Sequence, residues 1–205
     1  TVNTSTINFS YTDAFSGIAS CTLYFDGVSA DSNASVINDT DTLITASAQG
    51  DGSYVVYVNC TDTAGNTGQS NNITILIDAH APTVSMVNGT LNTSDNTTSI
   101  TFNYTDVVSG TANCTLNVDG SAVANNATTT NDTNTVLTST ALPDGAHSFN
   151  VTCIDEMGNT GYSSNITVNV DTVAPVVVMA NSSNVNTTVN TSTINFSYTD
   201  AFSGI

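Results

Sequence analysis

The sequence has 205 residues and contains no lysine or arginine, against 17 acidic residues and two histidines, so its formal net charge is −17. Binding of nucleic acid, phosphate groups or anionic lipid depends on Lys and Arg, and these functions are excluded. Asp, Asn, Thr, Ser and Gly are abundant, and they favour turns and strands over helices. An all-β fold is the first prediction.

Apolar and polar residues alternate over short segments in the first 80 residues. The alternating segments are 7–11, 21–25, 54–60 and 73–77. Alternation with period two is typical of strands with one buried face. Asp-Gly at 26–27 and 51–52, and Gly-Asn-Thr-Gly at 65–68, supply turns between such strands. Short strands with turns at regular intervals predict a β-sandwich, with a closed barrel as the alternative.

The same pattern returns 93 residues later, in a diverged form. Phe9-Ser-Tyr-Thr-Asp13 returns as Phe102-Asn-Tyr-Thr-Asp106, and many turn residues follow at the same offset. Residues 1–18 then return without change at 188–205, which gives a larger period of 187 residues. Repeats of this kind indicate a tandem array in which each larger period holds two modules.

Two prolines divide the chain into modules. Pro82 and Pro175 cannot donate to a sheet, and they keep the preceding residue extended. Residues 1–81 are predicted to form a module that lacks its first strand, 82–174 a complete module, and 175–205 the opening strands of the next copy. The first module is then expected to expose a sheet edge. A preceding segment of chain, or a strand donated by another subunit, would cover that edge.

Each module carries two cysteines, both on the inward phase of expected strands. The pairs are Cys21 with Cys60 and Cys114 with Cys153. We predict one disulfide per module across the sandwich, which would stabilise it by about 3 to 4 kcal/mol and place the chain outside the reducing cytosol. Four buried free thiols are the alternative. A zinc site is disfavoured, because neither His80 nor His147 recurs in the other module.

The N-glycosylation acceptor Asn-x-Ser/Thr is the densest motif and occurs 19 times. A composition rich in Asn and Thr produces some of these motifs by chance. Several nevertheless recur at the same place in both modules, or lie on the outward phase of a strand, and a coat of N-linked glycans is predicted. Such a density of acceptors favours a source organism that N-glycosylates its proteins, and we interpret that organism as an archaeon. The predicted acceptors are Asn3, Asn8, Asn33, Asn38, Asn72, Asn88, Asn96, Asn126, Asn131, Asn165, Asn181 and Asn195.

Six aspartates lie at expected strand ends, where several are expected to converge near a module junction. Calcium binds carboxylate and carbonyl oxygens, and it would offset charge that no basic side chain can neutralise. The alternative is that these residues only form turns and carry solvated charge. The predicted calcium ligands are Asp13, Asp62, Asp78, Asp106, Asp155 and Asp171.

Several strings in this chain resemble the immunoglobulin-like repeats of giant prokaryotic cell-surface proteins and adhesins. They include Cys60-Thr-Asp-Thr-Ala-Gly-Asn-Thr-Gly68 and the closing Ile77-Asp-Ala-His-Ala-Pro82. Repeats of that family often end in Asp-x-x-Ala-Pro and carry Asp-x-Ala-Gly-Asn before the last strand. The second module departs from this turn, with Asp155-Glu-Met-Gly-Asn159. The resemblance implies tandem immunoglobulin-like sandwiches on a cell surface.

The sequence therefore predicts a structural repeat segment of an extracellular filament, stalk or sheath, whose partners are copies of itself. An adhesin that binds a surface glycan or a partner cell is the alternative. Enzymatic activity is not expected, because no Ser-His-Asp or Cys-His set recurs between the modules. No apolar run reaches the 18 or so residues needed to cross a bilayer, so no membrane insertion is expected in this segment.

Overall fold

The structure, a computed structural model, describes residues 4–180, 188 and 193–201. In this part of the chain every regular element is a strand, which confirms the predicted all-β class. The chain divides into two compact units. Unit 1 comprises Thr1–Pro82 with the loops Thr105–Thr111 and Ile154–Thr160, and unit 2 comprises Thr83–Tyr104, Ala112–Cys153 and Gly161–Ile205. No helix among the described residues is long and apolar enough to cross a membrane.

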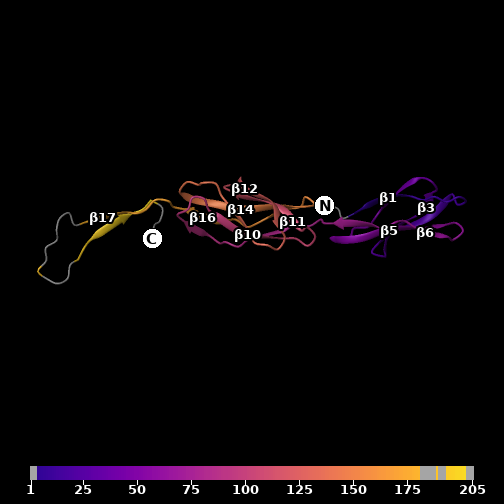
Figure 1. Ribbon diagram of the computed structural model, residues 1–205, viewed down its shortest axis with the longest axis horizontal. Helices are drawn as coiled ribbons and strands as arrows, with labels where there is room; N and C mark the ends of the chain where they lie inside the picture. Colours follow the sequence, from indigo (N-terminus) through magenta and orange to yellow (C-terminus); the bar gives the residue numbers. More distant parts are fainter. Residues whose placement is uncertain (1–3, 181–187, 189–192, 202–205) are drawn as a thin grey trace. The chain divides into compact units, whose positions relative to one another are not determined.

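Unit 1 contains a two-stranded and a five-stranded sheet (Figure 1). In the small sheet β1 (Thr6–Ser10) pairs antiparallel with β4 (Asp41–Thr45), with Phe9 opposite Thr42. In the large sheet the order is β3-β2-β5-β6, and β7 also pairs with β5. The strands of the large sheet are β2 (Ile18–Phe25), β3 (Val28–Ile37), β5 (Gly52–Asp62), β6 (Thr67–Gln69) and β7 (Ile73–Ile77).

Period-two alternation places the core of unit 1 between these sheets. β2 buries every second residue from Ala19 to Phe25, as the pattern predicts. Val56, Val58 and Ile44 bury their side chains in the same cluster. The two inner faces therefore form one sandwich core.

Unit 2 repeats this plan with two more strands (Figure 1). Its small sheet has the order β13-β10-β8, and its large sheet the order β12-β11-β14-β16-β9, with β15 on β14. The strands are β8 (Thr83–Met86), β9 (Leu91–Thr93), β10 (Ser99–Thr105), β11 (Thr111–Val118), β12 (Ser121–Thr130), β13 (Thr135–Thr138), β14 (Gly145–Asp155), β15 (Thr160–Tyr162) and β16 (Ile166–Val170). Phe102, Tyr104 and Phe149 are completely buried in its core.

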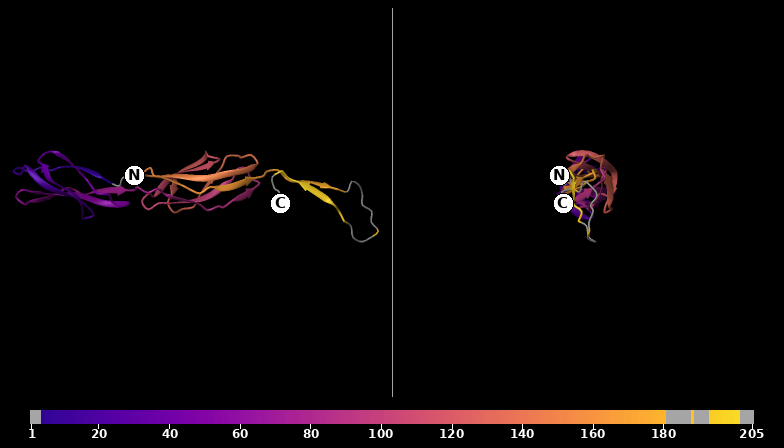
Figure 2. Two further views of the ribbon diagram at one scale, coloured as in Figure 1. Left: turned by 180° about the vertical axis from the view of Figure 1, so that it is seen from behind. Right: turned by 90° about the vertical axis from the view of Figure 1, so that its left-hand side faces the viewer.

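Two further strands close the described chain. β17 (Val176–Met179) and β18 (Phe196–Thr199) form a separate antiparallel two-stranded sheet, drawn in yellow in Figure 2. The large side chains of β17 stay between 53% and 60% exposed. An isolated hairpin of this kind is only marginally stable in water, so this part of the chain lacks the core that the two sandwiches have.

Hairpin turns form at two of the Asp-Gly pairs, whereas Asp51-Gly52 joins β4 to β5, which lie in different sheets. Asp26 and Gly27, between β2 and β3, have φ values of 49° and 80°, and Asp119 and Gly120 have 50° and 80°. A turn with positive φ at both central positions matches the twist of the flanking strands, and Asp-Gly is a favoured pair for it.

The predicted disulfides are present, Cys21 with Cys60 and Cys114 with Cys153. The expectation that they cross between the sheets of each sandwich is wrong. Cys21 lies directly opposite Cys60 in the ladder of β2 and β5, with Cα atoms 4.0 Å apart, and the second pair joins the neighbouring strands β11 and β14. Every buried residue of a strand points inward, so an inward-pointing cysteine does not reveal whether its disulfide partner lies in the same sheet or in the opposite one.

Candidate functional site

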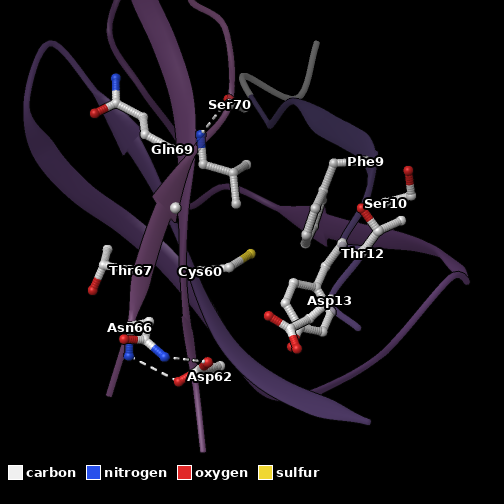
Figure 3. A pocket seen from close by; sticks show the side chains of 13 residues that line it. Phe9, Ser10, Thr12, Asp13, Cys60, Asp62, Asn66, Thr67, Gln69 and Ser70 are labelled. Atoms are coloured by element: carbon white, nitrogen blue, oxygen red, sulfur yellow. Dashed lines mark hydrogen bonds between the residues drawn. The ribbon is translucent and has the colours of Figure 1, made fainter. Parts of the chain in front are cut away.

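A groove of about 360 Å³ opens on unit 1 between β1 and the strands β5 and β6. Figure 3 shows Phe9 on one wall and the Cys60 sulfur on the other, pointing toward it. Val58 and Tyr11 also line the groove, and Asp62 lies toward one end. Hydrogen bonds from Asn66 hold the pKa of Asp62 below its usual range, so this carboxylate is ionised at neutral pH. The groove therefore combines a few apolar side chains with a largely polar lining and an acidic end.

The corresponding residues of unit 2 have no such opening. Phe102, Tyr104 and Cys153 are 0% exposed, whereas their counterparts Phe9, Tyr11 and Cys60 are only partly buried. Ser163 and Ser70 accept the same hydrogen bond, from Val151 and Val58 respectively, yet Ser163 is buried and Ser70 is exposed. Among the described residues, unit 1 thus has the strand arrangement of unit 2 without counterparts of β8 and β9.

Three of the six predicted calcium ligands come together within unit 1. Asp78, Asp106 and Asp155 each contribute a carboxylate oxygen to a group whose atoms lie within 4.8 Å of one another. The Ser109 hydroxyl donates to Asp78 Oδ2 over 2.8 Å, and Asn159 donates to the Asp78 carbonyl over 3.2 Å. Sequence reasoning did not identify Ser109 or Asn159 as members of this cluster.

The cluster carries concentrated negative charge. Burial raises the pKa of Asp78, the Ser109 hydrogen bond opposes this rise, and the carboxylates of Asp106 and Asp155 add to it. Asp155 is 6% exposed and accepts a hydrogen bond from the backbone N–H of Met157. Carboxylate oxygens in such a group are ligands that calcium prefers.

The other three predicted ligands are not part of this cluster. Asp13 accepts hydrogen bonds from the backbone of Phe15 and Ser16, and Asp62 accepts one from the backbone of Asn66. Asp171 accepts one from Val173. These side chains close turns, which agrees with the alternative interpretation of the aspartates as turn formers.

The two histidines occupy different local settings. His147 is buried, its Nδ1 lies 2.7 Å from Asp119 Oδ2, and its Nε2 lies 2.9 Å from the Pro143 carbonyl. The Asp119 hydrogen bond, followed by that to Pro143, raises the pKa of His147. In unit 1 Tyr54 stands in the same place and donates its hydroxyl to the Gly50 carbonyl over 3.0 Å. His80 contacts Asp51 and lies at the surface.

The predicted glycan acceptors within the described residues are all exposed or partly buried. Asn3 and Asn181 lie outside those residues. The partly buried acceptors are Asn33, Asn38, Asn88, Asn126 and Asn131, and the exposed ones are Asn8, Asn72, Asn96, Asn165 and Asn195. Each described acceptor is thus at least partly open to solvent.

Comparison with known families gives one match. Residues 83–172, which comprise the strands of the unit 2 sandwich, match the family described as the bacterial Ig-like domain. A search of the curated proteins found no match to this chain.

Several solved structures are similar to the chain at low sequence identity. The fibronectin(III)-like modules of Clostridium thermocellum CbhA are 16% identical, with a TM-score of 0.39, over 80% of this chain and 85% of that one. A 1.5-MDa bacterial ice-binding adhesin is 16% identical, with a TM-score of 0.43, over 86% of this chain and 61% of that one. The BSP domain of a biofilm-associated protein is 17% identical, with a TM-score of 0.35, over 82% and 28%.

Proposed function

We propose that this chain is a structural repeat segment of an extracellular filament, stalk or sheath. One observation carries the proposal: residues 1–18 return unchanged at 188–205, around two sandwiches of the same plan. Tandem repetition of one self-contained unit builds length rather than a catalytic centre. The role we assign is therefore structural and not enzymatic.

The chemistry of the chain fits an exposed location. Each sandwich has its own core and its own disulfide, and disulfides persist in oxidising compartments. Without lysine or arginine the chain offers no cleavage site to trypsin-like proteases. N-linked glycans at the open acceptor asparagines would add a hydrated, bulky coat.

Labelling of intact cells tests the proposal. An antibody against this chain should decorate fibres or a surface layer, and imaging of those fibres should show an axial repeat that matches one or two sandwiches. Labelling of permeabilised cells alone would contradict the extracellular location. Surface labelling without any periodic structure would contradict the structural role and leave the location standing.

An adhesive role is the second candidate, and one observation favours it. Phe15 is 100% exposed in the loop after β1, and Val107 is 93% exposed in the corresponding loop of the repeat. Exposed apolar side chains at loop tips are suited to contact a partner surface. Substitution Phe15→Ser should then reduce binding of the chain to glycan arrays or cells, whereas a purely structural segment would show no binding to lose.

A further inference from the structure

A pair of tyrosines lies on the outer face of the large sheet of unit 1. Tyr24 of β2 stands directly opposite Tyr57 of β5 in the antiparallel ladder. Leu23 and Phe25, on either side of the first tyrosine, are buried in the core, whereas both tyrosines are partly open to solvent. Because successive side chains of a strand point to opposite faces of the sheet, both phenol rings lie on the face turned away from the core.

The two rings of this pair are in contact with each other. Their centroids lie 5.1 Å apart and their planes are inclined by 12°, so the rings are stacked. Opposite side chains on neighbouring strands have Cβ atoms about 5 Å apart, and this spacing keeps the rings together. Tyr54, three residues before Tyr57 on the same strand, instead meets Phe25 edge-on, with planes inclined by 63°. Strand β5 therefore carries one tyrosine that is stacked on a second phenol and one that is not.

Unit 2 has asparagines in both places. Asn117 and Asn150 stand 93 residues after Tyr24 and Tyr57, and the Asn117 amide donates to the Thr152 hydroxyl over 3.1 Å. Unit 2 nevertheless forms the same strand order, β12-β11-β14 against β3-β2-β5 in unit 1. The sheet therefore does not need aromatic rings at these two positions, and the tyrosine pair is a property of unit 1 beyond the shared fold.

Two stacked phenols that are open to solvent are suited to oxidative coupling. A one-electron oxidant removes one electron and one proton from each phenol, which leaves two tyrosyl radicals. The radicals join by a carbon–carbon bond between the ring carbons next to the hydroxyl groups, and the hydrogens on those carbons then move to the phenol oxygens. With hydrogen peroxide as the final electron acceptor, two tyrosines and one peroxide give one dityrosine and two water molecules.

We propose that Tyr24 and Tyr57 are a modification site, at which hydrogen peroxide and a peroxidase-type catalyst form a dityrosine cross-link. Both partners are held on one chain, so their effective concentration exceeds that of tyrosines on separate chains. The new bond joins β2 to β5 on the outer face, and the Cys21–Cys60 disulfide joins the same strands on the inner face. Thiol reductants cleave a disulfide and leave a carbon–carbon bond intact. The two strands therefore stay covalently joined where the disulfide is reduced.

The test is oxidation of the complete 205-residue chain by a peroxidase and hydrogen peroxide, followed by disulfide reduction and cleavage before aspartate. This cleavage releases peptide 13–25, which contains Tyr24, and peptide 51–61, which contains Tyr57. Reduction removes the disulfide that also joins these peptides. The oxidised chain should still give the two peptides joined, lighter by two hydrogens than the sum of their masses and with the fluorescence of dityrosine.

Two phenylalanine variants separate this pair from general oxidation of tyrosine. Tyr57→Phe should lose the joined peptides, because phenylalanine has no phenol O–H from which a radical forms. Tyr54→Phe is the matched control, since it removes the other tyrosine of peptide 51–61, and it should give the joined peptides in the yield of the unaltered chain. Both variants keep an aromatic ring at the altered position, and melting before oxidation checks that unit 1 is folded in each.

Dilution distinguishes coupling within one chain from coupling between chains. The fraction of chains that give joined peptides should be the same at every protein concentration, and the product should run as a monomer on reducing gels. Three results would overturn the proposal: no joined peptides from the unaltered chain, equal yields from Tyr57→Phe and Tyr54→Phe, or a yield that rises with protein concentration. The proposal does not rest on the extracellular role proposed above, which the labelling experiment tests separately.

Discussion

At the scale of single residues, identical turn chemistry in the two units leads to different surroundings. Asp62 and Asp155 close the same turn, with the side chain of Asn66 or Asn159. Only Asp155 also has two further carboxylates beside it, those of Asp78 and Asp106. The sequence could predict that these aspartates end strands and close turns, because that behaviour is local. It could not show which three converge, because convergence depends on how loops distant in sequence fold together.

Calcium should stabilise the fold through this cluster. The raised pKa of Asp78 means that its ionised form is disfavoured in the folded state, so at neutral pH the cluster lowers stability, and a bound cation removes this penalty. Calcium at about 100 times its dissociation constant should stabilise unit 1 by about 2.7 kcal/mol, seen as a higher melting temperature than in excess chelator.

Asparagine variants separate a specific site from general screening of charge. Asp106→Asn should lose most of the calcium-dependent shift in melting temperature. Asp41→Asn, which changes an exposed aspartate outside the cluster, should keep it. Equal shifts in both variants, or no shift in the unaltered chain, would remove the calcium site.

His147 should make unit 2 sensitive to pH. Both of its ring nitrogens face oxygen acceptors, an arrangement that only the imidazolium satisfies. Because the folded pKa is raised above 6.5, this stabilisation is complete below that value and is lost as pH rises through the folded pKa. The free energy of unfolding of unit 2 should fall by about 1 kcal/mol across that window.

The sister position provides the matched variant. Tyr54 makes the same carbonyl contact in unit 1 with a phenol hydroxyl in place of the imidazole. His147→Tyr should therefore abolish the pH dependence, measured by denaturant unfolding at several pH values, while unit 2 still folds. A pH dependence that survives this substitution would show that other groups cause it.

At the scale of strands and sheets, much of the fold follows from period-two alternation and from Asp-Gly turns. The buried residues of β2 and β11 alternate along each strand, and the Asp-Gly pairs at 26–27 and 119–120 form the antiparallel hairpins that such a pair predicts. The pairs at 51–52 and 144–145 instead join strands of different sheets, which the local sequence does not reveal. Partners in the disulfides were predictable from their inward phase. Their placement within one sheet was not, because strand order in a sandwich depends on contacts between segments far apart in sequence.

The disulfides should stabilise the two units independently. Cys114→Ser with Cys153→Ser releases a loop closed over 39 residues, and the free energy of unfolding of unit 2 should fall by about 3 to 4 kcal/mol. Because unit 1 has a separate core, its own thermal transition should stay in place. The reverse pair, Cys21→Ser with Cys60→Ser, should lower only the other transition. Loss of both transitions together would mean that the units fold as one.

At the scale of the whole molecule, negative charge and acceptor asparagines define the surface. A formal charge of −17 with no lysine or arginine leaves the carboxylates to be balanced by ions from the medium. Self-repulsion of this size opposes close association of copies in dilute buffer.

Glycans should be present on the native protein. Peptides that contain the exposed acceptors Asn8, Asn72 and Asn165 are expected to carry excess mass in material from the native source. The same chain made in a host without N-glycosylation gives the reference mass. Native peptides with no excess mass at any acceptor would contradict the predicted coat. They would show that the acceptor motifs arise by chance from a composition rich in Asn and Thr.

The cross-link between neighbouring strands also determines how the chain responds to a pulling force. When a unit is stretched from its ends, tension passes directly from Cys21 to Cys60, so the residues between them bear none of it. The sequence separation of 39 residues corresponds to about 130 Å of extended chain, which the disulfide prevents from extending. Single-molecule pulling should show unfolding steps that lengthen by about this amount in reducing buffer. Steps of equal length in both buffers would show that the disulfides do not limit extension, whereas the expected difference would mean that each unit yields only part of its length before the covalent bond stops it.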